Sequence, residues 1–329
     1  MPWAHITGTG SCLPNKILTN HDLEKIVDTS DDWIVRRTGI KERRIASETE
    51  SESSAGLATR AAKHALDMAG CLPEDIDMIV AGTVTPDRVF PGTSCMVQKN
   101  LGASKAAAFD ISAGCSGFLY GLSIAKDSII SGSAKKVLII GVERMSRIIN
   151  WEDRSVCVLM GDGAGAVVVE AKDYNGGIMA LNIKSDGALW ELLYAEKGSF
   201  STPDILGEID LLPFYLKMEG NKVFRVAVEH MSEIALKTMA SLNLKKDDIK
   251  LVVPHQANIR IIQAIGKALD LPDEKVFLNI HRYGNMSAAT VPVALDEANR
   301  EGLIAEGDFV LLLSFGAGLT WASAIVKWG

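Results

Sequence analysis

The sequence predicts an α/β fold built from two similar halves that pack as a layered sandwich. Continuous apolar runs of four to seven residues alternate with longer segments of helical periodicity, which is typical of buried strands covered by helices. The chain also resembles itself. Ile249 in KDDIKLVVPH follows Ile76 in PEDIDMIVAG by 173 positions, and Val310 in GDFVLLLS follows Val137 in KKVLIIG by the same 173.

The elements follow from this duplication, with residues 1–172 as the first half and 173–329 as the second. In chain order, strands are expected within 73–82, 107–112, 135–141, 161–170, 246–255, 275–280, 307–314 and 315–328. Helices are expected over 54–70, 226–242 and 259–270. The first half holds about twenty extra residues between Gly141 and Gly163, which we interpret as a loop.

Composition and charge exclude several classes of protein. The chain has 329 residues, 47% of them hydrophobic, which describes a globular protein rather than a disordered or fibrous one. The net charge of −7, without a run of five like charges, argues against a nucleic-acid binder. No uninterrupted apolar run reaches about 18 residues, so we expect no membrane span.

The five cysteines are scattered without CxxC spacing, and the start MPWAHITGTG lacks a basic stretch that leads into an apolar one. We therefore expect reduced thiols and a cytoplasmic location.

The junctions between strands and helices are where an α/β sandwich collects its chemistry. In DISAGCSGFLYGL a strand is followed by a tight turn at Ala113 and Gly114, and Cys115 opens an apolar helix. Free backbone N–H groups at a helix start stabilise a thiolate, so Cys115 is expected to have a lowered pKa and to act as a nucleophile. The alternative is that Cys115 is a small buried core residue.

Two junctions of the second half carry further polar candidates. LVVPHQANIRII places His255 directly after a strand and a proline, and His281 on the charged HRYG turn is the second candidate histidine. In NIHRYGNMSAATVP, Asn285 falls roughly where Cys115 falls in the first half, and Ser287 is expected to cap a helix that begins near Ala288. The structural alternatives are a cap for His255 and a left-handed turn residue for Asn285.

Glycine-rich segments complete the candidate site. SFGAGLTW follows a predicted strand and offers backbone N–H groups to a developing oxyanion, although a simple tight turn is the alternative. GTGSCLPN and GDGAGA lack the full GxGxxG spacing, so a nicotinamide cofactor is not supported. The sequence shows neither a phosphate-binding P-loop nor a metal-spaced cluster of His and Cys, so we expect no metal and no cofactor.

Taken together, DISAGCSGF, VPHQANIRI, HRYGNMSAATVP and SFGAGLTWASAIVKW resemble the β-ketoacyl-acyl-carrier-protein synthase III family of thiolase-fold condensing enzymes. TSDDWIVRRTGIKERRIA and MEGNKVFRVAV extend this resemblance over essentially the whole chain. It implies a five-layer αβαβα sandwich and a homodimer. It also implies a decarboxylating Claisen condensation of an acyl-coenzyme A with malonyl-acyl carrier protein, the step that starts fatty-acid synthesis.

The resemblance also implies roles for individual residues. Cys115 would accept the acyl group, and the His255 ring nitrogen and the Asn285 amide would donate hydrogen bonds to the enolate oxygen that decarboxylation leaves. The backbone N–H of Cys115 and one from Ala317 or Gly318 would form the oxyanion hole. Ala317 stands where the family usually has glycine, and a positive φ there would cost about 1 kcal/mol.

By the same resemblance, Trp33 and Arg154 would hold the adenine end of coenzyme A, with Arg37 on the same surface and Asn221 near the pantetheine arm. Phe90 would lie at the acyl pocket, a position that often reaches across the dimer.

Arg225, Arg260 and Lys267 are expected to form a basic surface that receives the acidic carrier protein. Ordinary solvated charge is the simpler interpretation of these three residues. The segment from Glu191 to Lys217 is longer than the family usually has there, and it either covers the pocket or decorates the surface.

Two other functions remain open from sequence alone, and a third is disfavoured. A condensing enzyme of secondary metabolism, of the polyketide or quinolone type, would use the same three residues. A non-catalytic carrier-binding homologue would keep the fold without the chemistry. A degradative thiolase would need a second cysteine near the glycine loop, and SFGAGLTW supplies none.

Overall fold

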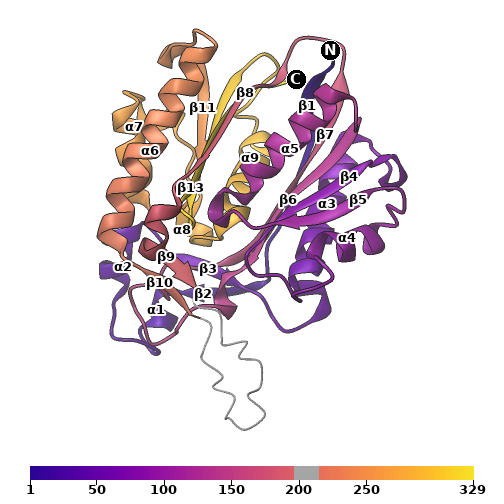
Figure 1. Cartoon of the computed structure of the whole chain (residues 1–329). Coiled ribbons are helices and arrows are strands. Elements are labelled where there is room, and N and C mark those ends of the chain that lie inside the picture. Colours follow the sequence, from indigo (N-terminus) through magenta and orange to yellow (C-terminus); the bar gives the residue numbers. More distant parts are fainter. Residues whose placement is uncertain (196–214) are drawn as a thin grey trace.

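The computed structural model describes residues 1–195 and 215–329, which form two stacked sheets with helices between and outside them (Figure 1). The first sheet has the strand order β1 (Trp3–Cys12), β7 (Asp162–Lys172), β6 (Lys136–Arg144), β4 (Met78–Gly82) and β5 (Ala107–Ile111). The second sheet has the order β8 (Gly177–Ser185), β13 (Thr320–Lys327), β12 (Phe309–Gly316) and β11 (Ile249–Pro254).

The two sheets share one pattern of strand directions. β4 runs parallel to β6, and β11 runs parallel to β12, while β7 and β13 return antiparallel beside them. The two sheets differ beyond β4 and β11. In the first sheet β5 lies beside β4, but in the second the strand expected over 275–280 does not form beside β11, and Val276 makes only an isolated bridge with Val252. The second sheet therefore lacks a counterpart of β5 in the described residues.

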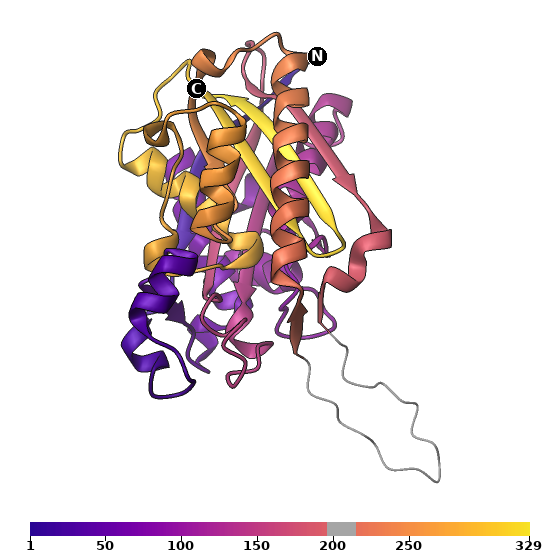
Figure 2. The ribbon, with the colours of Figure 1, turned by 90° about the vertical axis from the view of Figure 1, so that its left-hand side faces the viewer.

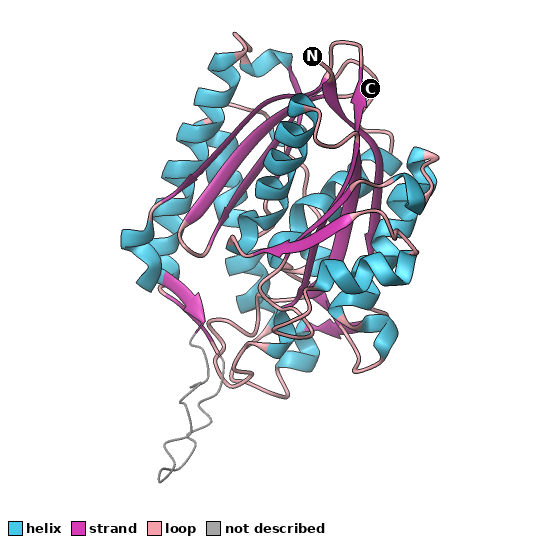
Figure 3. Cartoon of the chain, turned by 45° about the vertical axis from the view of Figure 1, so that its right-hand side comes forward, coloured by secondary structure: helices cyan, strands magenta, loops and turns pink. Residues whose placement is uncertain are grey.

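Six longer helices complete the five layers of the sandwich. α3 (Ser54–Ala69) and α4 (Thr93–Leu101) cover the outer face of the first sheet, α6 (Gly220–Ser241) and α7 (Ile259–Ala268) cover that of the second, and α5 (Gly117–Ser131) and α9 (Thr290–Arg300) lie between the sheets. Figure 2 looks onto α6 and α7, and Figure 3 shows the helical layers on both sides of the strands. The predicted αβαβα sandwich is thus confirmed.

The central layer explains why the helix after Cys115 is so apolar. Phe118, Leu119 and Leu122 of α5 are fully buried and share one core with Val291 and Leu295 of α9. A helix between two sheets has no solvent face, so its residues are apolar on most sides. Both central helices are therefore held firmly at their N-terminal ends, where the candidate residues lie.

Short elements gather at the end of the sandwich where the cavity opens. They are β2 (Lys16–Thr19), α1 (Asn20–Leu23), α2 (Asp31–Thr38), β3 (Glu42–Ile45), α8 (Ile280–Tyr283), and the two-stranded pair β9 (Leu193–Ala195) with β10 (Leu216–Met218). The predicted loop of the first half lies here too, since β6 ends at Arg144 and residues 145–161 run to β7 with a single 3₁₀ turn.

Most of the 191–217 segment lies outside the described residues. No helix among the described residues is long and apolar enough to cross a membrane.

Candidate active site

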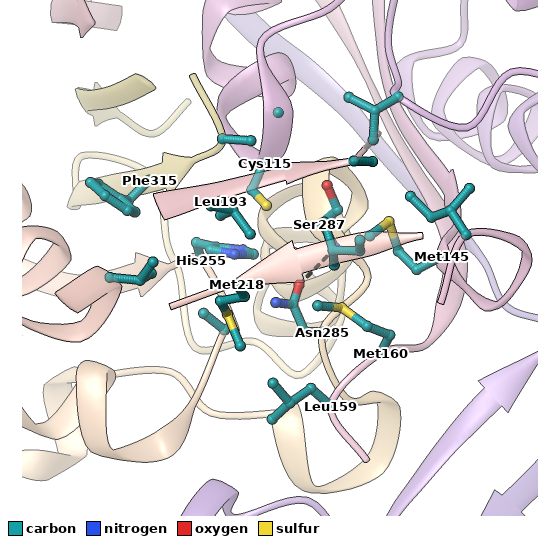
Figure 4. Close-up of a pocket in the computed structure, with 18 of the residues that line it drawn as sticks. Cys115, Met145, Leu159, Met160, Leu193, Met218, His255, Asn285, Ser287 and Phe315 are labelled. Carbon is teal, nitrogen blue, oxygen red and sulfur yellow. Dashed lines mark hydrogen bonds between the residues drawn. The ribbon is translucent and has the colours of Figure 1, made fainter. Parts of the chain in front are cut away.

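A cavity of about 900 Å³ lies where the two halves of the sandwich meet. Cys115 reaches it from the first half, and His255 and Asn285 reach it from the second. Figure 4 shows the sulfur, the imidazole and the carboxamide turned toward the same space. Residues 140 and 170 positions apart from Cys115 in sequence are thus brought together because β12, the neighbour of β11, and the turn over Ser287–Ala289 pack against the turn that carries Cys115.

Cys115 lies in a 3₁₀ turn, η3 (Gly114–Ser116), between β5 and α5. Burial raises the pKa of its thiol to about 12. The nearby Ser287 hydroxyl and the backbone N–H groups of Cys115 and Ala317 act in the opposite direction, and the charge of the Glu143 carboxylate raises this pKa further. The predicted lowering of the pKa is therefore wrong. Loss of hydration outweighs the helix dipole, and Cys115 precedes the first turn of α5 rather than lying within it.

The loop after β12 packs directly on Cys115. A Cβ atom added at Gly316 would come within 2.3 Å of the Cys115 nitrogen, and one added at Gly114 would come within 2.7 Å of the Ala317 nitrogen. Gly318 has a φ of +136°, whereas the described non-glycine residues with positive φ are Asn243, Asp270 and Ser287. Ala317 therefore bears no left-handed strain, and the cost expected for its methyl group does not arise.

His255 directly follows β11, and its backbone N–H donates to the Leu313 carbonyl at 2.8 Å. Its Nδ1 lies 2.5 Å from the Thr290 hydroxyl oxygen, and that hydroxyl lies 2.9 Å from the Ser287 carbonyl. Burial lowers the pKa of His255 to about 3, so the ring is neutral at pH 7. The single hydroxyl hydrogen of Thr290 has two acceptors within reach, and its direction decides which ring nitrogen carries the proton.

Asn285 is oriented by the backbone of its own turn. Its side-chain Oδ1 accepts from the Ser287 N–H at 2.8 Å, which leaves the NH₂ group as the donor that faces the cavity. Its backbone pairs with the 145–161 loop, since Asn285 donates to the Leu159 carbonyl at 2.8 Å and accepts from the Gly161 N–H at 3.0 Å. The amide thus has the polarity needed to stabilise negative charge.

Two residues around the site, Gln256 and Glu143, were not singled out from sequence, and a third, Ser287, was given a different role. Gln256 is fully buried, and its amide oxygen accepts from the backbone of Asn279 and Ile280, which ties the loop after β11 to α8. The predicted capping role of Ser287 is wrong, because its hydroxyl donates to the Glu143 carboxylate at 3.0 Å. Glu143 lies on β6, and a charged residue inside an apolar strand was the signal that could have revealed it.

The candidates for coenzyme A gather at the mouth of the cavity. The guanidinium carbons of Arg37 and Arg154 lie 5.0 and 5.1 Å from the centroid of the Trp33 ring. Arg154 also donates to the Asp28 carbonyl at 2.8 Å. All three side chains line the cavity, and so does Asn221 at the start of α6. The mouth therefore offers an aromatic face with two cations.

The remaining candidates lie further out. Phe90 is 82% exposed and is not among the residues that line the cavity of its own chain. Arg225 on α6 and Arg260 and Lys267 on α7 are exposed, and Arg260 lies at the cavity rim. The second histidine candidate, His281, does not line the cavity. No cluster of three or more His, Cys, Asp or Glu side chains suited to a metal ion occurs in residues 1–195 and 215–329.

Comparison with known proteins relates this site to one family. The family models described as 3-oxoacyl-[acyl-carrier-protein (ACP)] synthase III and its C-terminal part match residues 109–187 and 239–328. The beta-ketoacyl-[acyl-carrier-protein] synthase III of Caldanaerobacter subterraneus subsp. tengcongensis is 52% identical over 99% of this chain and 98% of its own length.

Solved structures give the same relationship. The crystal structure of 3-oxoacyl-[acyl-carrier-protein] synthase III from Aquifex aeolicus is 48% identical and has a TM-score of 0.91, with 99% of this chain and 100% of that chain covered. The corresponding enzyme from Thermus thermophilus is 44% identical and has a TM-score of 0.92, with 99% of each chain covered.

Proposed function

Because the chain belongs to the β-ketoacyl-[acyl-carrier-protein] synthase III family, we propose that Cys115, His255 and Asn285 carry out its reaction. The chain is an acyltransferase that condenses an acyl-coenzyme A with malonyl-acyl carrier protein and releases carbon dioxide. The observation that carries the residue assignment is the shared cavity, in which one thiol, one imidazole and one carboxamide meet from both halves of the chain.

In the first half-reaction, the Cys115 sulfur attacks the thioester carbon of the acyl-coenzyme A, and the coenzyme A sulfur departs. The backbone N–H groups of Cys115 and Ala317 support the negative oxygen of the tetrahedral intermediate. Their contacts with the thiol, together with the close packing of Gly114 on Ala317, favour Ala317 over Gly318 as the second donor.

In the second half-reaction, malonyl-acyl carrier protein loses carbon dioxide and leaves an enolate that attacks the acyl carbon on Cys115. The Asn285 NH₂ group donates to the enolate oxygen. His255 donates from Nε2 once the Thr290 hydroxyl hydrogen turns to Nδ1, which its 2.5 Å contact permits. A neutral imidazole suits this task, because it supplies a donor without adding a charge that must be desolvated.

The outer residues bind the larger parts of the substrates. The Trp33 ring, with Arg37 and Arg154 beside it, suits the flat adenine base and the phosphates of coenzyme A. Asn221 lies along the path to Cys115. The exposed cations Arg225, Arg260 and Lys267 form the docking surface for the acidic carrier protein.

The chain acts as a homodimer in this proposal. The exposure of Phe90 at 82% and Val89 at 79% supports it, because two adjacent large apolar side chains beside a cavity favour a covering partner. Phe90 would then border the acyl pocket of the partner subunit rather than its own. The chemistry needs no cofactor, because thioester exchange and decarboxylation are driven by the substrates themselves.

The experiment is intact-mass spectrometry after mixing the protein with a panel of short straight and branched acyl-coenzyme A compounds. We expect a mass increase equal to one acyl group, located on the peptide that contains Cys115 and absent from Cys115→Ser. The starter that adds fastest identifies the preferred acyl chain. Wild-type protein that takes up none of the panel would refute the assignment of Cys115 as nucleophile.

A further inference from the structure

Glu143 is a fully buried carboxylate that the proposed reaction leaves without a role. Its Oε1 accepts from the Ser287 hydroxyl at 3.0 Å, and its Oε2 accepts from the Val84 N–H at 3.1 Å and from the hydroxyls of Thr83 and Thr85 at 3.2 and 2.5 Å. Every one of these neighbours is a neutral donor. Such a set of donors stabilises the ionised carboxylate without neutralising it, so Glu143 keeps its ability to take up a proton.

Ser287 connects this carboxylate to the nucleophile. Its hydroxyl hydrogen is directed at Glu143, and its hydroxyl group lies beside the Cys115 thiol. Because the serine hydrogen is already donated, the serine oxygen is the acceptor for the thiol hydrogen. Figure 4 shows Ser287 beside Cys115 within the cavity.

The backbone holds Ser287 firmly in this position. Its φ of +46° is unusual for a residue with a side chain, and its N–H donates to the Asn285 side chain at 2.8 Å. A non-glycine residue in this conformation is typical of functional sites, where the surrounding structure enforces it. A hydroxyl group is thus placed between a thiol and a carboxylate at some conformational cost.

The charged and titratable groups around Glu143 leave it free to act as a base. Cys115 is the titratable group that faces it from η3. Arg144, the next residue on β6, turns its guanidinium to the Glu48 carboxylate and the Ser47 carbonyl. Burial raises the pKa of Glu143 to about 7 and lowers that of His255 to about 3, so the carboxylate is the stronger base of the two.

We propose that Ser287 and Glu143 form a proton relay that accepts the thiol hydrogen of Cys115 during acylation. This inference rests on the proposed role of Cys115. As the sulfur attacks the acyl carbon, the thiol proton moves to the Ser287 oxygen and the Ser287 hydrogen moves to Glu143 Oε1. When the bond from carbon to the coenzyme A sulfur breaks, the proton returns along the same path to that sulfur, so that one thiol is consumed and one is released.

The test measures alkylation of Cys115 by iodoacetamide as a function of pH, because this reaction needs deprotonation of the thiol but no acyl-coenzyme A. Wild type should show a rate that rises with an inflection near pH 7, as Glu143 ionises. In Glu143→Gln the rate at pH 7.5 should fall at least about tenfold, and the inflection should move above pH 9. Ser287→Gly, which tolerates the positive φ and removes the hydroxymethyl side chain, should behave in the same way.

Asp162→Asn is the matched control. Asp162 is also a buried carboxylate, and it accepts from the N–H groups of Ala46 and Ser146, but it does not contact Cys115. Its variant should keep the wild-type pH profile.

Unchanged profiles in Glu143→Gln and Ser287→Gly, or an equal loss in Asp162→Asn, would overturn the relay. If Glu143→Gln does not fold, Ser287→Gly decides the question. A wild-type protein that is alkylated as described but takes up no acyl group would instead count against the proposed function and leave the relay standing.

Discussion

At the scale of single residues, the site combines three groups that are neutral at pH 7. Burial keeps the Cys115 thiol and the His255 ring uncharged, and Asn285 carries no charge at any pH. In a neutral, buried site, each hydrogen bond to a developing oxyanion is stronger than it would be in water. The transition state, rather than the resting protein, then holds the charge.

Asn285→Ala tests whether Asn285 acts in decarboxylation but not in acylation. Loss of the NH₂ donor should slow decarboxylation by about two to three orders of magnitude, because one oxyanion donor is removed. Acylation of Cys115 should stay close to the wild-type rate. Single-turnover measurements of acyl transfer and of carbon dioxide release distinguish the two, and equal loss in both would contradict the assigned role.

His255 gives a pH dependence of stability with a defined sign. Its pKa is about 3 in the folded protein and about 6.5 when exposed, so between these values the unfolded chain binds a proton that the folded chain does not. The contribution of His255 to the free energy of unfolding is fully present above pH 6.5. It decreases by about 1.4 kcal/mol for each pH unit below that value.

The comparison with His255→Gln isolates this effect from other groups, including Glu143. Between pH 7.5 and 5.5, the free energy of unfolding of wild type should fall relative to that of the variant by about 1.4 kcal/mol in urea titrations. If the free energies of unfolding of wild type and of His255→Gln changed equally with pH, the ring would not be buried as described.

The candidate site residues could be recognised from the sequence, but their burial and hydrogen-bond partners could not. Cys115 and His255 were recognisable because they follow strands, and Asn285 because its turn matched a family motif. The pKa of Cys115 was predicted in the wrong direction, since local position reveals the helix dipole but not the burial that packing produces. Ser287 was expected only to cap a helix, and its contact with Glu143 could not be predicted because the two residues lie 144 positions apart and meet only in the folded chain.

At the scale of elements, two strand ends and two helix starts converge on the cavity, and glycines allow them to approach. Gly316, at the end of β12, lies so close to η3 that an added methyl group would meet the Cys115 nitrogen at 2.3 Å. Backbone atoms cannot move aside as a flexible side chain can. This contact therefore sets the distance between the oxyanion loop and the nucleophile.

Gly316→Ala should lower the free energy of unfolding by about 1 to 3 kcal/mol through overpacking, and it should slow acylation because the Ala317 N–H is displaced. Gly187→Ala is the control, since an added Cβ there has no neighbour within 4 Å, and its stability should change by less than about 0.5 kcal/mol. Chemical denaturation of both variants provides the measurement. Equal stability of the two would contradict the packing described.

Most elements were predictable, because buried strands and amphipathic helices leave periodic patterns. The strands β1 and β8 were not among those expected, and the strand expected over 275–280, from its correspondence with 107–112, does not form. In the folded chain only Val276 bridges to β11, and the Gln256 side chain instead takes the backbone N–H groups of Asn279 and Ile280. The side-chain amide of Gln256 thus takes backbone hydrogen bonds that a neighbouring strand would otherwise make. A local sequence pattern does not reveal such a contact.

At the scale of the whole molecule, the duplicated architecture places the site between its two halves. Each half supplies part of the cavity, and the 145–161 loop that interrupts the similarity provides much of its wall, including Arg154 and Leu159. The repeat was visible in sequence because two pairs of predicted strands share an offset of 173 positions. The cavity was not, because it forms only when both halves pack on α5 and α9.

A homodimer predicts a particle mass of twice 35.4 kDa in light scattering. Phe90→Ala should leave this mass unchanged but alter the relative rates for short and branched starters, because in the proposed dimer the side chain would border the acyl pocket of the partner. A particle of 35.4 kDa at assay concentrations, or starter preferences that do not respond to the variant, would contradict this arrangement.

The most direct test of Cys115 as the acyl carrier follows one acyl group through both half-reactions. Protein carrying a labelled acyl group on Cys115 is purified and mixed with unlabelled malonyl-acyl carrier protein in a rapid-quench instrument. We predict that the label appears in 3-oxoacyl-acyl carrier protein at a rate at least equal to steady-state turnover. Label that stays on the protein, or that leaves more slowly than turnover proceeds, would contradict Cys115 as the acyl carrier.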